Sequence, residues 1–163
     1  MSAIQKIFIA FFILMTIISI SSVSYSMHIY FKALDTTNDI KVSVTDIKIV
    51  YPYPGSPYVS INTTIYIENP TDLSLKYNSV GTKLYLNSPN NYLGESYFYV
   101  PYHRMPRLDP FSNVTVTISI ANVPSNQVTV DHKTWIAKIT VWLYGIPMFE
   151  GGALFRRDVP YSG

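Results

Sequence analysis

The segment Tyr99–Pro110 (YVPYHRMPRLDP) gathers the side chains of this sequence that are best suited to recognition chemistry. Tyr and Arg are enriched at binding hot spots, and loops on rigid β scaffolds commonly carry binding residues. The prolines of the segment predict a loop, and its candidate recognition residues are Tyr102, His103, Arg104 and Arg107. In the simpler alternative, the prolines fix the loop and the two arginines pair with nearby acids such as Asp109.

Patterns for catalysis, cofactors and metals are missing from the sequence. The histidines His28, His103 and His132 lie far apart, and the absence of cysteine excludes disulfides, thiolate catalysis and cysteine-type zinc sites. There is no glycine-rich phosphate loop, no nucleophile elbow and no zinc-protease motif. We therefore predict that the chain is not an enzyme and has no cofactor and no metal site. Folding can still bring distant carboxylates together.

Charge and short motifs bear on the partners. The net charge of +2 is spread without a run of Lys or Arg, so we expect no nucleic-acid partner. The triplets Asn62-Thr63-Thr64 and Asn113-Val114-Thr115 are acceptors for N-linked glycans, which makes Asn62 and Asn113 candidate glycosylation sites in an exported protein. Since such triplets also occur by chance, ordinary strand residues are the alternative.

The N-terminal segment Ile7 to Phe31 contains no Asp, Glu, Lys or Arg and is long enough to cross a bilayer as a helix. It is either a retained signal anchor, or a signal peptide cut near Ser24 or Ser26, where small polar residues follow the apolar core. A buried core helix is a third alternative. The apolar and aromatic residues Met27 to Phe31 favour the anchor, so we predict membrane lipid as the partner of residues 7–31.

Membrane orientation is weakly encoded, because Lys6 on one side is matched by Lys32 and Lys41 on the other. An N-terminal apolar segment followed by one long domain usually translocates that domain. We therefore expect a single-pass protein of the cytoplasmic membrane with its main domain outside the cytoplasm. The expected division is an anchor or signal peptide at 1–31, a polar tether at 32–40 and one domain at 41–163.

The domain sequence alternates apolar and polar residues with the period of a β-strand. The residues expected to face inward are Val59, Ile61, Thr63, Ile65 and Ile67; Val80, Thr82, Leu84 and Leu86; Val114, Val116, Ile118 and Ile120; and Trp135, Ala137, Ile139, Val141 and Leu143. Both Asn62 and Asn113 fall on the outward parity. The alternation predicts strands, with each candidate glycosylation site facing water.

Three irregularities in this alternation carry further predictions. The apolar parity switches between Val44 and Ile47, which predicts a β-bulge near Thr45-Asp46. The strand from Trp135 to Leu143 has apolar residues on its second face as well, so that face is covered or meets a partner. The outward tyrosines are candidates for an aromatic face that binds a partner or a glycan: Tyr66, Tyr85, Tyr97 and Tyr99.

Turn signals rich in Pro, Gly and Asn separate about seven short strands, the last expected from Phe149 to Val159. No helix is indicated outside the N-terminal segment. This pattern predicts an all-β domain, an antiparallel two-sheet sandwich of the immunoglobulin type.

The stretch from Lys41 to Pro160 resembles the water-stress and hypersensitive-response (WHy) domain of the late-embryogenesis-abundant (LEA) type 2 family. The resemblance rests on Asn69-Pro70 after a long strand, the strand Val80 to Leu86, and Leu93-Gly94 before a later strand. One departure from that family is that residues 128–133 replace its usual glycine-bearing loop before the last strands. The resemblance implies a fibronectin-III-like sandwich, often membrane-anchored in microbes, with stress-protective or binding roles and no catalytic residues.

Taken together, the sequence predicts a membrane-anchored, extracytoplasmic β-sandwich with a non-catalytic binding, structural or stress-protective role at the cell envelope. Its partner would be a protein or a glycan at the cell surface. One alternative is a secreted filament subunit that donates the strand within Met27 to Tyr53 to a neighbour after signal cleavage. Another is a stress-protective domain tethered on the cytoplasmic side. The cysteine-free, Tyr- and Ile-rich composition suggests an archaeal source.

Overall fold

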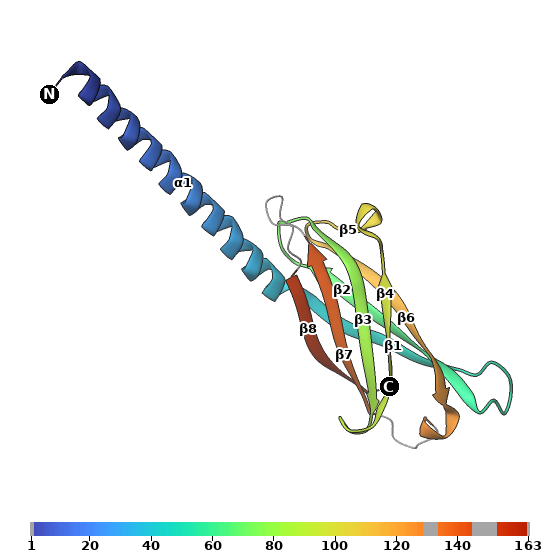
Figure 1. Ribbon diagram of the computed structural model, residues 1–163. Helices are drawn as coiled ribbons and strands as arrows, with labels where there is room; N and C mark the ends of the chain where they lie inside the picture. The colour runs from blue at the N-terminus through green and yellow to red at the C-terminus, as the bar shows by residue number, and fades with distance from the viewer. Residues whose placement is uncertain (1, 129–133, 145–152, 163) are drawn as a thin grey trace. The chain divides into compact units, whose positions relative to one another are not determined.

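The structure is a computed structural model that describes residues 2–128, 134–144 and 153–162. It divides into two compact units, residues 1–35 and residues 36–163, and each is described by itself. The first unit holds most of one long helix, and the second holds the β-strands (Figure 1). The described residues thus contain one N-terminal apolar helix and a domain built from antiparallel sheets.

Helix α1 spans Ala3–Asp39 and begins with a reciprocal cap. The Gln5 backbone N–H donates to the Ser2 hydroxyl at 3.3 Å, and the Ser2 N–H donates to the Gln5 side-chain oxygen at 3.0 Å. The part Ala3–Lys32 is long and apolar enough to cross a membrane, and an N-terminal signal sequence would meet the same criterion.

The helix continues through the segment that the sequence analysis assigned to a polar tether. Residues 32–39 contain neither Gly nor Pro, so nothing in them breaks the helix before Asp39. Ile40 then forms the junction with the first strand, and its side chain is buried in the domain core. Only one residue therefore separates the helix from the β domain.

The strands of the domain form two sheets in which every pairing is antiparallel. The three-stranded sheet has the order β1 (Lys41–Val50), β2 (Tyr58–Asn69), β6 (Ser112–Pro124). The five-stranded sheet has the order β4 (Tyr92–Tyr99), β3 (Leu75–Leu86), β7 (Thr134–Tyr144), β8 (Ala153–Ser162), and the two-residue β5 (Arg107–Leu108) pairs with the start of β3.

The final strand differs from the prediction in its limits. β8 starts at Ala153 and continues to Ser162, because its pairing with β7 extends to the Thr134↔Ser162 pair. Residues 149–152 of the predicted strand lie outside the described residues. The two-residue β5 was also not predicted, since the pattern of two residues is too short to read.

The inner faces of the two sheets share one hydrophobic core. Every residue expected to face inward is buried, except Val114, which is partly buried at the start of β6. Across the core, β6 lies against β4 at one edge and β1 lies against β8 at the other. The period-two prediction is therefore confirmed, and the arrangement is sandwich-like (Figure 1).

The predicted β-bulge is confirmed in β1. Val44 pairs with Ile65 and Asp46 pairs with Thr64, which leaves Thr45 as the extra residue. The Thr45 hydroxyl donates to the Thr64 carbonyl at 3.3 Å. Because β1 is an edge strand of its sheet, the bulge also interrupts the row of backbone groups that another strand would need for pairing.

Candidate functional site

The predicted recognition loop joins β4 to β6 and contains a short 3-10 turn, η1 (Tyr102–Arg104), followed by β5. His103, Arg104 and Arg107 are exposed, while the side chain of Tyr102 lies outside what the structure describes. Backbone bonds fix the loop: the Val100 N–H donates to Asn78 at 2.7 Å and the Arg104 N–H donates to Pro101 at 2.8 Å. The loop thus presents polar side chains from a fixed backbone.

A buried asparagine ties this loop to the body of the domain. The Asn69 side-chain nitrogen lies 2.7 Å from the Leu73 carbonyl, 3.2 Å from that of Leu108 and 3.1 Å from that of Asp109. Its side-chain oxygen accepts from the Thr71 N–H at 3.2 Å and from the Thr71 hydroxyl at 2.7 Å. Asn69 is fully buried, so one amide braces the β2–β3 connection against the end of the recognition loop.

The two arginines of the loop have different surroundings. Arg107 Nε lies 3.6 Å from Asp109 Oδ1, and its Nη2 donates to the Ser74 hydroxyl at 3.4 Å. This is the pairing expected in the simpler alternative, and it is solvent-exposed and weak. Arg104, in contrast, has no carboxylate partner among the residues that the structure describes.

A second candidate site is the outer face of the five-stranded sheet, which we call the aromatic face. Its described residues come from β3, β4 and β7 and lie in cross-strand register: Tyr85 with Tyr92 and Ile136, Lys83 with Glu95 and Lys138, Gly81 with Tyr97 and Thr140, and Ser79 with Tyr99 and Trp142. Four of its aromatic residues are exposed: Tyr92, Tyr97, Tyr99 and Trp142. The face offers a row of flat rings at one edge of the sheet.

Gly81 allows one of these rings to lie across the sheet. A Cβ atom placed on Gly81 would meet two Tyr97 ring carbons at 2.4 Å, so the ring occupies the space above the glycine. Gly81 sits in the interior of β3, where a glycine normally weakens a strand. The close approach of the Tyr97 ring is the physical reason for a glycine at this position.

Charged groups between the rings are paired with one another. Lys83 Nζ lies 2.6 Å from Glu95 Oε2, and this hydrogen bond with the Glu95 carboxylate raises the pKa of Lys83. Lys138 Nζ lies 5.1 Å from the centre of the Tyr85 ring, within the range of a cation–π contact. Burial raises the pKa of Tyr92, and the nearby Glu95 raises it further. The aromatic face therefore combines apolar rings with one neutralised ion pair and with a lysine cation that lies over a ring.

Tyr66 does not join the other predicted tyrosines. It lies on β2, in the three-stranded sheet, and is half-buried on that sheet's outer face. The prediction of one face containing all four tyrosines is wrong for Tyr66, because the sheet to which a strand belongs depends on its distant partners. Sequence reasoning omitted Tyr92 and had noted Trp142 only as an apolar residue on the second face of its strand.

Both candidate glycosylation sites have the predicted outward orientation. Asn62 lies mid-strand on β2 between Lys48 and Ser119, and it is half-buried. Asn113 lies at the start of β6, paired with Glu68, and it is exposed. Glycosylation of either residue stays a prediction, and Asn113 offers the more open acceptor.

Chemical machinery is not evident in the described part of the chain. No group of three or more His, Asp or Glu side chains within it is placed to hold a metal ion. The predictions of no enzyme, no metal and no cofactor remain predictions.

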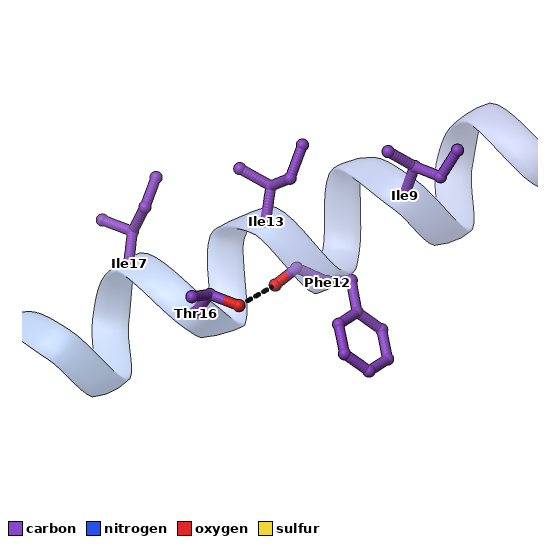
Figure 2. A pocket seen from close by; sticks show the side chains of 5 residues that line it. All are labelled: Ile9, Phe12, Ile13, Thr16 and Ile17. Atoms are coloured by element: carbon purple, nitrogen blue, oxygen red, sulfur yellow. Dashed lines mark hydrogen bonds between the residues drawn. The ribbon is translucent and has the colours of Figure 1, made fainter.

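From Ile7 to Ile20, the surface of α1 is apolar on all sides apart from Thr16 and Ser19. A shallow recess between side chains is lined by Ile9, Phe12, Ile13, Thr16 and Ile17 (Figure 2). The Thr16 hydroxyl donates to the Phe12 carbonyl at 2.8 Å, and the Ser19 hydroxyl donates to the Met15 carbonyl at 2.9 Å. The polar hydrogens of these hydroxyls are satisfied within the helix, as a lipid environment requires.

Comparisons with known proteins give no match in sequence and weak matches in structure. No family model matches this chain, and no curated protein matches it significantly. A candidate ApaA protein from Bordetella pertussis is 18% identical, with a TM-score of 0.46 over 76% of this chain and 90% of that one. A protein from Archaeoglobus fulgidus is 11% identical, with a TM-score of 0.42 over 74% and 98%.

A candidate late embryogenesis abundant protein is 13% identical, with a TM-score of 0.41 over 88% of this chain and 83% of that one. At these identities and TM-scores, the likenesses carry no argument about fold family or function. The resemblance based on Asn69-Pro70 and Leu93-Gly94 therefore stays a prediction from sequence.

Proposed function

We propose that this chain is a membrane-anchored protein that displays an immunoglobulin- or fibronectin-III-like β-sandwich outside the cytoplasmic membrane. Its role is binding, structural support or stress protection at the cell envelope, without catalytic turnover. The proposal keeps the likeness to the WHy domain of LEA type 2 proteins, in which the Asn69-Pro70 pair is one of the motifs. The buried brace made by Asn69 gives that pair a structural role in this chain.

The observation that carries the anchoring is the surface of Ala3–Lys32. The most apolar stretch of 18 residues in this segment is rich in Ile and Phe, and none of it is buried. A helix that is apolar all round and exposed in a soluble protein would aggregate, whereas in a bilayer the same side chains contact acyl chains. The internal hydrogen bonds of Thr16 and Ser19 lower the polar cost of the most apolar part of the segment.

The binding role rests on the aromatic face. Exposed Tyr and Trp side chains supply large contact areas with little loss of side-chain entropy, and they are enriched at interfaces. The Lys83–Glu95 pair is neutral and Lys138 lies over the Tyr85 ring, so the face carries few charges, which suits a protein or glycan partner rather than a highly charged polymer. Photo-crosslinkers placed at Tyr97 and at Tyr66 in cells test this role. We expect a discrete adduct from Tyr97 and none from Tyr66; equal labelling would contradict the assignment.

Anchoring is tested by the intact mass and N-terminal sequence of protein recovered from membranes, together with protease treatment of intact cells. A chain that begins at residue 1 or 2 and is cleaved by external protease supports the proposal. A chain that begins near Tyr25 or Met27 supports the secreted subunit instead. Full protection from external protease, with Asn62 and Asn113 unmodified, supports the cytoplasmic-facing alternative.

The filament alternative receives no support from the strand order. β1 already forms the edge of its own three-stranded sheet, paired with β2 along its length. Donation of this strand to a neighbour would therefore require exchange of β1 between copies, as in domain swapping.

A further inference from the structure

The most exposed aromatic side chains of the β domain lie at one end of it. We call this the junction end: it holds the start of β1 at Lys41, which pairs with Glu68, together with the β2–β3 connection and the recognition loop. Phe111 is 75% exposed and Tyr99 is 65% exposed, more than any other large apolar or aromatic residue described in residues 36–163. Exposed tyrosines also lie at the opposite end of the domain, at Tyr51, Tyr53 and Tyr58, so it is the higher exposure of Phe111 that calls for a physical reason.

Phe111 is held in a conformation that its side chain does not favour. Its φ is 53°, in the left-handed region, and it follows Pro110 in a turn closed by a Ser112 N–H to Asp109 bond of 3.3 Å. Gly or Asn is the usual residue at such a position, and a bulky residue there is strained. The turn itself would be more stable with a smaller residue, so the fold does not explain the phenyl ring.

Exposed basic groups lie in the same loop as this ring. His103 and Arg104 are exposed on η1, and Arg104 has no carboxylate partner in the described chain. An exposed guanidinium in one connection with exposed aromatic rings is the composition of protein surfaces that lie at membrane interfaces, where rings meet the headgroup region and cations meet phosphates.

The chain also limits how far the junction end can be from a bilayer. Lys32 ends the apolar part of the helix, and Lys41 begins β1. At the helical rise, these nine steps cover about 13 Å, and even a fully extended chain would cover only about 30 Å. A span that ends at Lys32 therefore keeps the junction end close to the headgroups.

We infer that the junction end of the domain docks on the lipid surface. Phe111 enters the boundary between headgroups and acyl chains, Tyr99 lies in the headgroup layer, and Arg104 with His103 contacts headgroup phosphates. The inference rests on the proposed membrane anchoring and adds a second, reversible contact with the same membrane. It reassigns the predicted recognition loop, together with Tyr99 at the end of β4, from an external partner to lipid. Tyr92, Tyr97 and Trp142 of the aromatic face are left for the external partner.

The absence of cysteine allows a direct test in the full chain. Single variants Asn113→Cys, at the junction end, and Tyr53→Cys, in the opposite loop after β1, are spin-labelled and reconstituted into vesicles of phosphatidylcholine with phosphatidylglycerol. Collision rates with oxygen and with a water-soluble nickel complex report depth. We expect an oxygen-to-nickel ratio about threefold higher at Asn113→Cys than at Tyr53→Cys. Equal ratios would overturn the docking inference.

A substitution at Phe111 separates docking from folding. Asn tolerates the left-handed conformation, so Phe111→Asn keeps the turn while removing the ring. In the Asn113→Cys background, Phe111→Asn should lower the oxygen-to-nickel ratio to the value measured at Tyr53→Cys, without lowering the melting temperature. An unchanged ratio would show that the ring does not enter the lipid, and would leave the loop available for a protein partner.

Flotation of the same vesicles distinguishes a failure of the proposed membrane anchoring from a failure of the docking inference. A chain that floats with lipid, resists extraction at high pH and shows equal label depths retains the anchor and loses the docking. A chain that stays in the aqueous fraction overturns both. Replacing phosphatidylglycerol by phosphatidylcholine should reduce the ratio at Asn113→Cys, and Arg104→Gln should remove that dependence on anionic lipid.

Discussion

The outer faces of the two sheets differ, although their inner faces are alike. The outer face of the three-stranded sheet, which we call the hydroxyl-rich face, carries two tyrosines of β2, the exposed Tyr58 and the half-buried Tyr66. Its other side chains from β2 and β6 are mainly small and polar: Ser60, Asn62, Thr64, Thr115, Thr117 and Ser119. The aromatic face of the five-stranded sheet carries four exposed rings and paired charges. Both inner faces are lined by buried Ile, Val and Leu.

This difference separates what folding requires from what it leaves free. An antiparallel sheet needs one apolar face, and both sheets meet that need with the same alternation. Outward positions on a strand need only β propensity, and Thr or Tyr meets it equally well. The cluster of four exposed rings on one sheet, against mainly small polar side chains on the other, is therefore where functional information lies.

The largest effects should come from the inner faces and should be equal in the two sheets. Ile65→Ala in β2 and Ile139→Ala in β7 each remove a side chain that is at most 1% exposed. We expect each to lower the free energy of unfolding by about 2–5 kcal/mol, from lost burial and the remaining cavity. Urea denaturation of the full chain in detergent measures both. A large cost in one sheet alone would break the equivalence of the inner faces.

A smaller effect of opposite sign is expected at the threonines of the two inner faces. The hydroxyl oxygens of Thr63 and Thr82 are buried without a hydrogen-bond partner in the described structure. Thr63→Val and Thr82→Val should each raise the free energy of unfolding by about 1 kcal/mol, because an unsatisfied hydroxyl leaves the core. Thr117→Val, on the exposed outer face, serves as the matched control, and an equal gain there would assign the effect to β propensity.

Gly81→Ala tests the geometry of the aromatic face. The new Cβ would displace the Tyr97 ring, but this ring is exposed and can swing away, so the free energy of unfolding should fall by less than about 1 kcal/mol. The ring-current shift at residue 81, measured by NMR, should be lost. Thr64→Ala, on the outer face of the other sheet, is the control and should leave the ring-current shift at residue 81 unchanged. Retention of the shift would show that the ring does not lie over Gly81.

The stabilisation from the Lys83–Glu95 pair of the aromatic face should be lost at alkaline pH. Because Glu95 raises the pKa of Lys83 above its ordinary 10.5, the stabilisation is complete below pH 10.5 and is lost as the pH rises through the raised value. The raised pKa of Tyr92 acts with the same sign. Above pH 10.5, the melting temperature should therefore fall less steeply with pH in Lys83→Gln and in Glu95→Gln than in the wild type. If the melting temperatures of both variants fell with pH as steeply as that of the wild type, the Lys83–Glu95 pair would not contribute to stability.

The smallest effects are expected at the hydroxyl-rich face. Asn62→Gln and Asn113→Gln change outward side chains, so each should shift the free energy of unfolding by less than about 0.5 kcal/mol. In a host that glycosylates, the same variants should lose the mass of a glycan. Identical masses of wild type and variants there would count against glycosylation and against export to that compartment.

Much of the fold could be predicted from local pattern. The alternation along β2, β3, β6 and β7 placed the inward residues correctly, because a period of two needs no knowledge of partners. The bulge at Thr45 could also be located, since a change of parity within one strand has few other causes. The apolar character of α1 was equally clear from composition.

What failed depends on contacts between distant residues. Tyr66 is separated from Tyr97 because β2 pairs with β1 and β6, whereas β4 pairs with β3, and no local pattern states these pairings. The strain at Phe111 depends on a turn that also bonds to Thr71. The end of α1 depends on where the chain enters the domain core at Ile40, and the end of β8 depends on how far its pairing with β7 extends.

The brace formed by Asn69 also bears on how long the protein lasts. Asparagine side chains age by cyclisation, in which the backbone nitrogen of the following residue attacks the side-chain carbonyl. The following residue here is Pro70, whose nitrogen carries no hydrogen and is already fully substituted. An aspartate formed at this site would place a carboxylate against three carbonyl oxygens and release the recognition loop. The Asn-Pro order thus protects the brace from the reaction that would most directly destroy it.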